Sequence, residues 1–332
     1  MKKKITLIGG CGFIGHNLAL KLNETGFNVN VIDSLAVNNL LSLDIDKTKN
    51  KFLYSSILKN RIEILKKSRI ELKIQDARDF SAMSKLIDNI KPDIIIHLAA
   101  ISHSNKSNKD PHSTFDHNLK TLENTLNIAK NKNIHVIYLS SSMVYGNFEM
   151  AKVNEETHCK PIGIYGSLKL SGELLTKAYN QVFGLPYTIV RPSALYGERC
   201  ISRRVGQIFI ENSLTTKEIT ISGTGEEKLD FTYIDDFVNG LILCCQNENA
   251  KNETFNLTYG SAKKILDLAE IVKKEFPDIS INFKNKDRLM PDRGTLDISK
   301  AKKLLNYNPK FELSQGFKKY IGWYKNFWTK IN

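Results

Sequence analysis

The sequence predicts an α/β fold with a doubly wound parallel β-sheet and a smaller C-terminal lobe. Three observations carry this prediction. Short runs rich in β-branched residues alternate with helical stretches through the first two-thirds of the chain, as in successive βαβ units. A glycine-rich turn directly follows the first of these runs. The runs read as strands that helices cover on both faces, which is typical of parallel sheets.

The strands and helices of the first two-thirds can be assigned from these runs. The expected strands are Lys4–Ile8, Asn28–Ile32, Glu71–Gln75, Ile94–Leu98, His135–Ser140 and Tyr187–Arg191. The expected helices are Gly12–Thr25, Ser81–Asn89, Pro111–Asn131 and Ile164–Phe183. The connection Asn38–Arg69 is polar and unusually long, but Leu and Ile recur at helical spacing over Phe52–Leu65. We expect an inserted helix there, not a separate domain.

The last third of the chain has a different organisation. Beyond Arg191 the alternation gives way to shorter elements with glycine turns such as Ser222–Gly225. At 332 residues the chain is long enough for two domains. We therefore expect residues 1–190 to form the sheet domain and residues 191–332 to form mainly a substrate-binding lobe, segments of which could return to the sheet domain.

The composition is that of a soluble globular protein, with 41% hydrophobic and 25% charged residues. No apolar run approaches the roughly 18 to 20 residues that a membrane span needs. The lysines Lys2–Lys4 precede only a short apolar run, which predicts a buried first strand and not a signal peptide. These features predict a cytoplasmic protein without a membrane partner.

Charge and cysteine content exclude two further classes. The net charge of +13 comes from lysines spread along the whole chain, without a motif for nucleic-acid binding, so an anionic small molecule is the expected partner. The five cysteines lack the paired spacing of a disulfide framework or a zinc site, and no metal is expected. They are Cys11, Cys159, Cys200, Cys244 and Cys245.

The glycine turn predicts a dinucleotide site in a Rossmann domain. Its glycines allow the backbone to turn sharply and to approach a pyrophosphate, whose charge faces the N-terminus of the following helix. Asp33, at the end of the second strand, can accept hydrogen bonds from both hydroxyls of the adenosine ribose and would repel a 2′-phosphate. NAD is therefore favoured over NADP. The expected contacts here are Gly9, Gly12, Phe13, Ile14, Gly15, Asp33 and Ser34.

A second pattern predicts redox catalysis. Tyr165 and Lys169 are four residues apart, on one face of a helix. A phenol with a pKa of about 10 is a poor base at neutral pH, but a neighbouring ammonium and the positive nicotinamide lower its pKa. The tyrosine can then take a hydroxyl proton while a hydride leaves the same carbon. Upstream, the strand before Ser140–Ser142 ends in hydroxyls, one of which could bind the reacting oxygen.

Together these motifs resemble the NAD-dependent epimerase/dehydratase family of nucleotide-sugar enzymes, within the extended short-chain dehydrogenases/reductases. The resemblance covers nearly the whole chain and rests on motifs that occur in the family's order. They are the glycine turn, Asp76–Asp79, His97–Ala100, Asn118, Ser141–Gly146, Tyr165 with Lys169, Arg191–Gly197, Gly223–Gly225, Asp230–Asp236, Asp297–Lys300 and Asn306–Pro309.

The resemblance implies roles for individual residues. Tyr165 becomes the general base, Lys169 its electrostatic partner and a ligand of the nicotinamide ribose, and Ser141 the third catalytic group. The family also implies contacts with the adenosine and pyrophosphate of NAD from Asp76, Ala77, Leu98, Ala99 and Ala100. It further implies a homodimer formed through the helices Pro111–Asn131 and Ile164–Phe183.

Three departures from the family pattern bear on the substrate. In the family's 4,6-dehydratases an acid follows the catalytic serine or threonine, whereas this chain has Ser142 and Met143, which disfavours dehydration. Ala194 and Leu229 replace an asparagine and an arginine that ordinarily help to hold the nucleotide diphosphate. Other donors must then bind it. The arginine candidates are Arg199, Arg203, Arg204, Arg288 and Arg293, and the further expected substrate contacts are Ser102 and Ser142.

The expected reaction begins with oxidation of a sugar C4 hydroxyl. Either re-reduction on the other face follows, giving an epimerase, or the 4-keto sugar leaves, giving a dehydrogenase. The Asp76–Asp79 block, the insert and the acid-free serine run are also similar to GDP-heptose-modifying enzymes of capsule synthesis. The alternatives are a 4,6-dehydratase and a redox-silent NAD-binding regulatory protein. The intact Tyr165, Lys169 and Ser141 argue against the regulatory protein.

Overall fold

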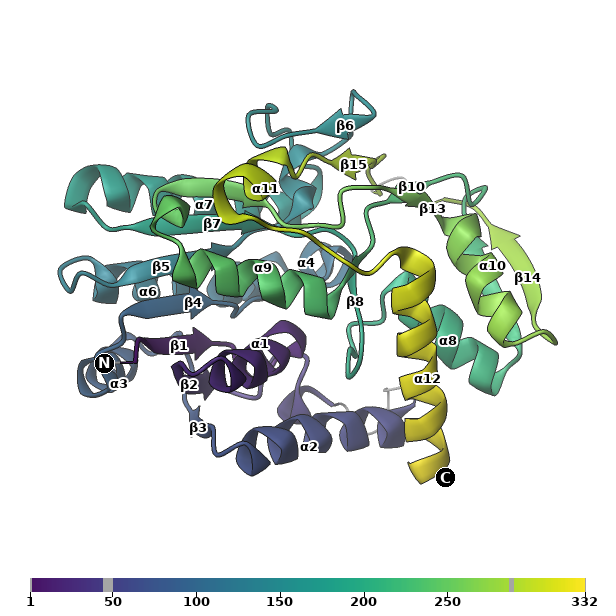
Figure 1. Ribbon diagram of the computed structural model, residues 1–332, viewed down its shortest axis with the longest axis horizontal. Helices are drawn as coiled ribbons and strands as arrows, with labels where there is room; N and C mark the ends of the chain where they lie inside the picture. The colour runs from purple at the N-terminus through teal and green to yellow at the C-terminus, as the bar shows by residue number, and fades with distance from the viewer. Residues whose placement is uncertain (1, 44–49, 287–289, 332) are drawn as a thin grey trace.

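A seven-stranded parallel sheet forms the centre of the molecule, in the order β12-β7-β5-β4-β1-β2-β3 (Figure 1). The computed structural model describes residues 2–43, 50–286 and 290–331. The strands are β1 (Lys4–Ile8), β2 (Asn28–Asp33), β3 (Glu71–Ile74), β4 (Ile94–His97), β5 (His135–Leu139), β7 (Tyr187–Arg191) and β12 (Glu253–Asn256). The predicted Rossmann-like α/β fold is confirmed.

Six of these strands lie within one residue of the predicted bounds, and β12 was not predicted. β12 comes from the last third of the chain and pairs with β7, from Glu253 opposite Thr188 to Asn256 opposite Arg191. A segment of the C-terminal part therefore returns to the sheet, as the sequence had left open.

Alternate residues of each strand face two separate helical layers. On one face, Ile5 and Leu7 of β1 share a buried core with α1 (Phe13–Glu24) and α9 (Ile234–Gln246). On the other, Ile8 shares a core with α3 (Phe80–Ile90) and α6 (Thr121–Ala129), beside which lies α7 (Gly163–Phe183). Helices thus cover both faces of the sheet (Figure 1), and the central strands β4, β5 and β7 are buried on both sides.

The expected helix Pro111–Asn131 is divided into three parts. They are α5 (Pro111–Phe115), a π-helical turn (Asp116–Lys120) and α6. Asn118 lies buried in the π-helical turn, where its side chain accepts a hydrogen bond from the main-chain nitrogen of Ile101 at 2.7 Å and donates one to its carbonyl. A π-helical turn shifts the side chains of a helix by a fraction of a turn. Here it places Asn118 against the segment that follows β4.

The inserted helix is present as α2 (Lys51–Lys67). It buries Leu53, Ile57 and Leu58 in the core beside α1, and its N-terminal part lies next to α12 (Leu313–Ile331) (Figure 1). The periodicity of leucine and isoleucine therefore predicted the helix. Two polar side chains of α2, Tyr54 and Arg61, are also almost fully buried.

The C-terminal lobe packs against the carboxyl edge of the sheet. Its larger elements are α8 (Val205–Thr215), β9 (Glu218–Ser222), α10 (Ile265–Glu275), β14 (Ser280–Lys284) and α12, with β9 and β14 paired in parallel. The remaining short elements are η1 (Leu40–Ser42), α4 (Ser104–Lys109), η3 (Ser142–Tyr145), β6 (Lys152–Val153), β8 (Leu195–Tyr196), β10 (Lys228–Leu229), β11 (Thr232–Tyr233), η4 (Glu248–Ala250), β13 (Lys263–Lys264), β15 (Thr295–Leu296) and α11 (Ser299–Leu305).

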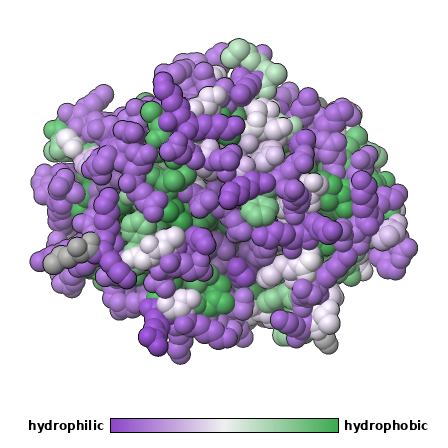
Figure 2. All heavy atoms as spheres, in the orientation of Figure 1, coloured by the Kyte–Doolittle hydropathy of each residue, from purple (hydrophilic) through white to green (hydrophobic). Residues whose placement is uncertain are grey.

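The surface agrees with the composition. On the face shown in Figure 2, hydrophilic side chains predominate and hydrophobic ones form small separate groups. Of the helices within the described parts of the chain, none combines the length and the apolar character that crossing a membrane requires.

Candidate functional site

A cavity at the carboxyl edge of the sheet brings together most of the predicted site residues. Binding sites in doubly wound sheets form at this edge, where the turns after the strands converge. The predicted residues that line the cavity are Gly9, Gly12, Phe13, Ile14, Gly15, Asp33, Ser34, Asp76, Ala77, Leu98, Ala99, Ala100, Ser102, Ser141, Ser142, Tyr165, Lys169, Arg204 and Arg293.

The glycine turn has the geometry that a pyrophosphate site needs. Gly9 has a positive φ of +82°, and a Cβ there would lie 2.7 Å from the main-chain nitrogen of Ala99. A Cβ on Gly15 would lie 2.5 Å from the Cα of Gly10. The first glycine thus permits the turn and the last permits the close approach of α1, whose N-terminus faces the cavity at Gly12.

Asp33 is buried at the end of β2 and is held by the backbone. Its Oδ2 accepts a hydrogen bond from Cys11 N, and its Oδ1 accepts one from Leu35 N, both at 2.8 Å. Burial raises the pKa of Asp33, while these two hydrogen bonds and the charge of Arg61 act to lower it. Each oxygen retains a lone pair for a ribose hydroxyl. The glycine cradle and this acceptor therefore fit NAD.

The neighbouring thiol does not contribute a charge to this part of the site. Burial, followed by the charge of Asp33, raises the pKa of Cys11 to about 12. The thiol is therefore neutral near pH 7, and Cys11 fills space beneath the turn.

Tyr165, Lys169 and Ser141 lie close to the middle of the cavity wall, each less than one-tenth exposed. Ser141 caps η3, because its Oγ accepts a hydrogen bond from Met143 N at 3.2 Å. Burial raises the pKa of Tyr165, whereas the charge of Arg204 and a hydrogen bond with Ser141 lower it. The hydroxyls of Tyr165 and Ser141 thus lie together on the cavity wall, and both side chains are largely buried.

Lys169 lies one helical turn beyond Tyr165 on α7. Its Nζ donates a hydrogen bond to the carbonyl of Leu139, the last residue of β5. Burial lowers the pKa of Lys169 to about 7, and the carboxylate of Glu173 acts in the opposite direction. Lys169 therefore changes between its charged and its neutral form near neutral pH.

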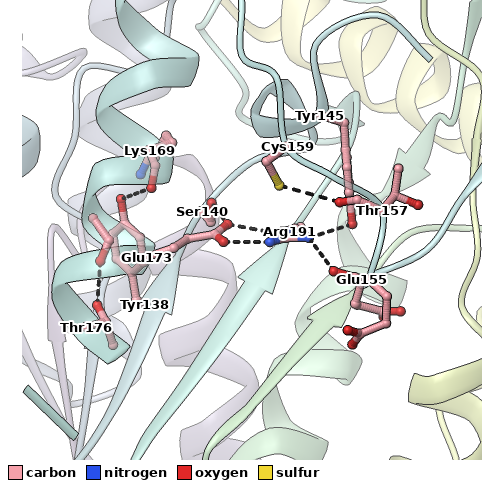
Figure 3. A network of polar contacts seen from close by, with 12 residues as sticks. Tyr138, Ser140, Tyr145, Glu155, Thr157, Cys159, Lys169, Glu173, Thr176 and Arg191 are labelled. Atoms are coloured by element: carbon pink, nitrogen blue, oxygen red, sulfur yellow. Dashed lines mark hydrogen bonds and ion pairs between the residues drawn. The ribbon is translucent and has the colours of Figure 1, made fainter. Parts of the chain in front are cut away.

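A buried ion pair joins α7 to the sheet (Figure 3). Glu173 of α7 and Arg191 of β7 approach to 2.6 Å, and their side chains are 1% and 4% exposed. Ser140, next to Ser141, donates its hydroxyl to Glu173. Arg191 also donates to the hydroxyl of Tyr145, which donates to Asn256 of β12. The network thereby ties α7 to the ends of three strands beneath the cavity.

Of the described arginines that were predicted to bind the diphosphate, Arg204 and Arg293 line the cavity. Arg204 donates to the carbonyl of Ser102 at 2.9 Å. The Nε of Arg293 is buried and has no hydrogen-bond partner among the described residues. Burial, with the charge of Arg204, lowers the pKa of Arg293 to about 10. An unpartnered buried donor beside a second cation is suited to an anionic group of the substrate.

The other arginine candidates have different positions. Arg199 is not among the residues that line the cavity, because its guanidinium donates to His16 and Asn17 of α1. Arg203 is also absent from the cavity wall. Arg288 lies outside the described residues.

Acidic side chains gather at one end of the cavity. Among the described residues of its wall, the acids are Asp33 and Asp76, which follow β2 and β3. Ser141 follows β5, and β4 and β1 separate β5 from β2. Three strand spacings of about 4.8 Å place β2 about 14 Å from β5. Glu155 and Glu198 are engaged elsewhere, accepting from Asn256 N and from the hydroxyl of Tyr233.

Arg61 is a charged residue of the cavity wall that was not predicted as a site residue. It reaches the wall from the inserted helix α2. In the sequence it stands in a helix with five lysines and arginines, where a solvent-exposed charge is the ordinary expectation. Its position on the same face as Leu58 and Leu65 is the one signal that indicated burial.

The chain matches a family model over about three-quarters of its length and similar proteins over nearly all of it. The model described as the NAD dependent epimerase/dehydratase family matches residues 5–258. A Bacillus subtilis protein described as an uncharacterized UDP-glucose epimerase is 30% identical over 321 residues, which is 94% of this chain and 95% of that protein. UDP-glucuronate 4-epimerase 1 of Arabidopsis thaliana is 27% identical, over 98% of this chain and 77% of that protein.

Solved structures of two 4-epimerases are also similar to this chain over nearly its whole length. The UDP-glucuronic acid 4-epimerase of Bacillus cereus, in complex with UDP-glucuronic acid and NAD, superposes with a TM-score of 0.87 at 29% identity, covering 97% of this chain and 99% of that one. The UDP-glucose 4-epimerase of Thermotoga maritima, with UDP-glucose, gives a TM-score of 0.83 at 26% identity, with the same coverage. The chain therefore belongs to the NAD-dependent epimerase/dehydratase family, and NAD is its cofactor.

Proposed function

We propose that this protein is a UDP-sugar 4-epimerase that inverts the sugar C4 through a 4-keto sugar. One observation carries the proposal: Tyr165, Lys169 and Ser141 face a cavity whose described acids are confined to the far end, after β2 and β3. Such a site can oxidise and reduce a hydroxyl, but it lacks a nearby acid that could expel a second one. The 4-epimerases among the similar proteins support this choice.

The residues divide the reaction between them. NAD, when bound, accepts a hydride from C4 of the sugar and returns it to the opposite face. Tyr165 takes the proton of the C4 hydroxyl as the hydride leaves and returns it during reduction. Ser141, already hydrogen-bonded with Tyr165, orients the same oxygen. Lys169, one helical turn from Tyr165, can stabilise the tyrosinate that forms in the reaction.

The cations at the other side of the cavity suit the diphosphate of the substrate. Arg204 and Arg293 both line the wall, and Arg293 has a buried Nε with a free hydrogen. A guanidinium binds a phosphate through charge-assisted hydrogen bonds in a fixed geometry. The similar proteins that are described by nucleotide act on or bind UDP-sugars, which supports UDP and gives no support to GDP-heptose.

We further propose a homodimer that forms through α5–α6 and α7. Leu174 and Val182 lie on the outer face of α7 and are 61% and 70% exposed. Phe115, on the adjacent α5, is 46% exposed. Large apolar side chains so exposed on neighbouring helices are suited to pack against the same surface of a second copy. We place this dimer in the cytoplasm, with residues 1–190 as its NAD-binding domain.

The first prediction concerns the reaction itself. Purified protein incubated with UDP-glucose, UDP-glucuronic acid and UDP-N-acetylglucosamine should convert at least one into its C4 epimer. Mass spectrometry should show no change of mass, and NMR of the anomeric proton should show the epimer. Loss of two hydrogens with accumulated NADH would identify a dehydrogenase, and loss of water would identify a dehydratase.

The matched control is Tyr165→Phe, which keeps the ring and removes only the proton-accepting oxygen. Turnover should fall by a factor of about 10² to 10⁴ while NAD stays bound, because this is the usual contribution of a general base. Turnover within tenfold of the wild type would exclude Tyr165 as the base.

The second prediction follows from the pKa of Lys169. Below pH 7 the lysine is charged in the folded and the unfolded chain, so the full cost of its burial is present. Between pH 7 and 10.5, the ordinary pKa of a lysine, the folded chain loses this proton while the unfolded chain keeps it, and the cost declines. Lys169→Met should therefore raise the melting temperature of the NAD-free protein most below pH 7, with a gain that shrinks toward pH 10.

Differential scanning calorimetry from pH 6 to pH 10 measures this gain. Lys177→Met, on the same helix, is the control and should change the melting temperature equally across that range. A gain for Lys169→Met that does not vary with pH would show that the lysine is not held in the folded state with a lowered pKa.

The third prediction concerns the diphosphate. Arg293→Met should weaken UDP binding about 10- to 100-fold, since a hydrogen bond to a charged group contributes about 1.5–3 kcal/mol. Uridine, which lacks phosphate, should bind the variant and the wild type equally. Isothermal titration measures both, with Arg203→Met as a control that leaves the cavity wall unchanged. Equal loss for UDP and uridine would contradict a phosphate contact.

The fourth prediction concerns assembly. Leu174→Glu combined with Val182→Glu should convert the dimer into a folded monomer, because a charge would be buried at the proposed interface. Light scattering after size exclusion measures the mass. Ile74→Glu, on the exposed edge strand β3, is the matched control and should remain a dimer. A monomeric wild type at micromolar concentration would refute the dimer.

A further inference from the structure

Arg61 of the inserted helix connects two segments that belong to different parts of the cavity. Its Nε donates to the carbonyl of Arg199 at 3.0 Å, and its Nη2 donates to the same oxygen. Its Nη1 donates to the carbonyl of Cys11, in the glycine turn, at 3.4 Å. One guanidinium thus spans from the NAD-binding turn to the segment that follows β8.

Arg199 is tied to the cofactor side through its side chain as well. Its Nε donates to His16 Nε2 at 2.9 Å, and its Nη2 donates to Asn17 at 3.2 Å, both on α1. Burial, with the charges of Arg61 and Arg199, lowers the pKa of His16 well below its usual value, so the ring is neutral. Its Nδ1 then carries the proton and donates to Gly12 O at 2.8 Å. The contacts form a closed ring around the glycine turn.

The same face of α2 also holds the far end of this segment. Tyr54, two turns before Arg61, donates its hydroxyl to Glu211 of α8 at 2.7 Å. Glu211 also accepts from Gln207 at 2.7 Å, and the side-chain oxygen of Gln207 accepts from Arg203 N at 2.9 Å. The inserted helix therefore fixes both ends of residues 199–211.

The segment 199–204 carries part of the substrate wall. Ile201, Ser202 and Arg204 line the cavity, and Arg204 faces both Tyr165 and the carbonyl of Ser102. Any shift of the glycine turn that reaches this segment would therefore move a cation relative to the catalytic base and to the expected diphosphate.

The chemistry of Arg61 is unusual for a residue with only a packing role. It is 1% exposed, and its hydrogen bonds to the described residues all go to main-chain carbonyls. A buried cation without a hydrogen-bonded carboxylate is costly, and an apolar side chain of similar size would pack there at lower cost. An apolar side chain could fill the same space, but it could not donate hydrogen bonds to two main-chain segments.

We propose that Arg61 is a positioning residue that couples NAD binding to substrate binding, by holding residues 199–204 to the glycine turn. NAD would bind at the glycine turn and the nucleotide sugar beside Arg204, and Arg61 connects the two segments that hold them. Binding of either ligand then increases the affinity for the other. Such coupling is reciprocal by linkage. The identity of the second ligand as a UDP-sugar rests on the proposed function, whereas the coupling of the segment to NAD does not.

Two measurements on NAD-free protein test the proposal. In the first, isothermal titration gives the UDP affinity with and without saturating NAD. For the wild type we expect NAD to tighten UDP binding about tenfold, within the usual range for coupled sites. For Arg61→Met we expect this factor to fall to about one, with the UDP affinity of the NAD-free protein changed less than about threefold. A purely structural role would weaken both affinities and leave their ratio unchanged.

In the second measurement, hydrogen exchange of residues 199–204 is followed as NAD is added. Exchange should slow at least several-fold in the wild type and should not respond in Arg61→Met. Arg61→Lys, which keeps the charge but cannot span both carbonyls, should give an intermediate result and serves if the methionine variant fails to fold. Tyr54→Phe keeps the Arg61 contacts and should retain the wild-type response.

The outcomes separate the two proposals. If UDP fails to bind the wild type at any concentration of NAD, the proposed function is wrong, and hydrogen exchange alone decides the role of Arg61. If wild-type exchange in residues 199–204 is insensitive to NAD, or if Arg61→Met and Arg61→Lys keep the wild-type response, the coupling role is refuted.

Discussion

The buried ion pair between Glu173 and Arg191 is the contact on which the catalytic geometry depends. Tyr165, Lys169 and Glu173 follow one another at four-residue intervals on α7, so fixing Glu173 to β7 fixes the height and rotation of the other two above the sheet. Removing one partner of such a pair costs about 3–5 kcal/mol, because the other charge stays buried. The same carboxylate moderates the loss of charge at Lys169. Glu173 therefore both fixes α7 to the sheet and influences the charge of Lys169.

The charges within the cavity are sorted by distance along the sheet. Asp33 and Asp76 follow β2 and β3, about three strand spacings from Ser141, and Asp76 is paired with Arg78. Arg204 and Arg293 line the same cavity. The proposed reaction agrees with this arrangement, because no described acid of the cavity wall lies near Ser141 and Tyr165. A sugar hydroxyl beyond C4 would therefore have no proton donor to help it leave.

The features that the sequence predicted well are those with a local physical cause. The strands before the glycine turn and before Ser141 are short β-branched runs, and the helix pair Tyr165–Lys169 needs only helical periodicity. β12 escaped prediction because Glu253–Asn256 has a single apolar residue, Phe255, and lies in a lobe of short elements. Its assignment depends on pairing with β7, about 65 residues earlier in the chain, which no local pattern reveals. The burial of Arg61 and the contacts of Arg199 with α1 depend on tertiary packing in the same way.

The inserted helix α2 adds a structural constraint to the family fold without adding a binding site of its own. Its apolar face, with Leu58 and Leu65, supplies the burial that holds the helix against the core. That burial allows Arg61 and Tyr54 to reach partners that are distant in the sequence, at some cost in desolvation. Their partners lie in the glycine turn and in residues 199–211, the segment that carries Arg204. A stably packed α2 therefore holds the cofactor side and the substrate side of the cavity in a fixed position relative to each other. An epimerase depends on that relation twice in each turnover, because the 4-keto sugar must stay bound while its other face turns to the returning hydride.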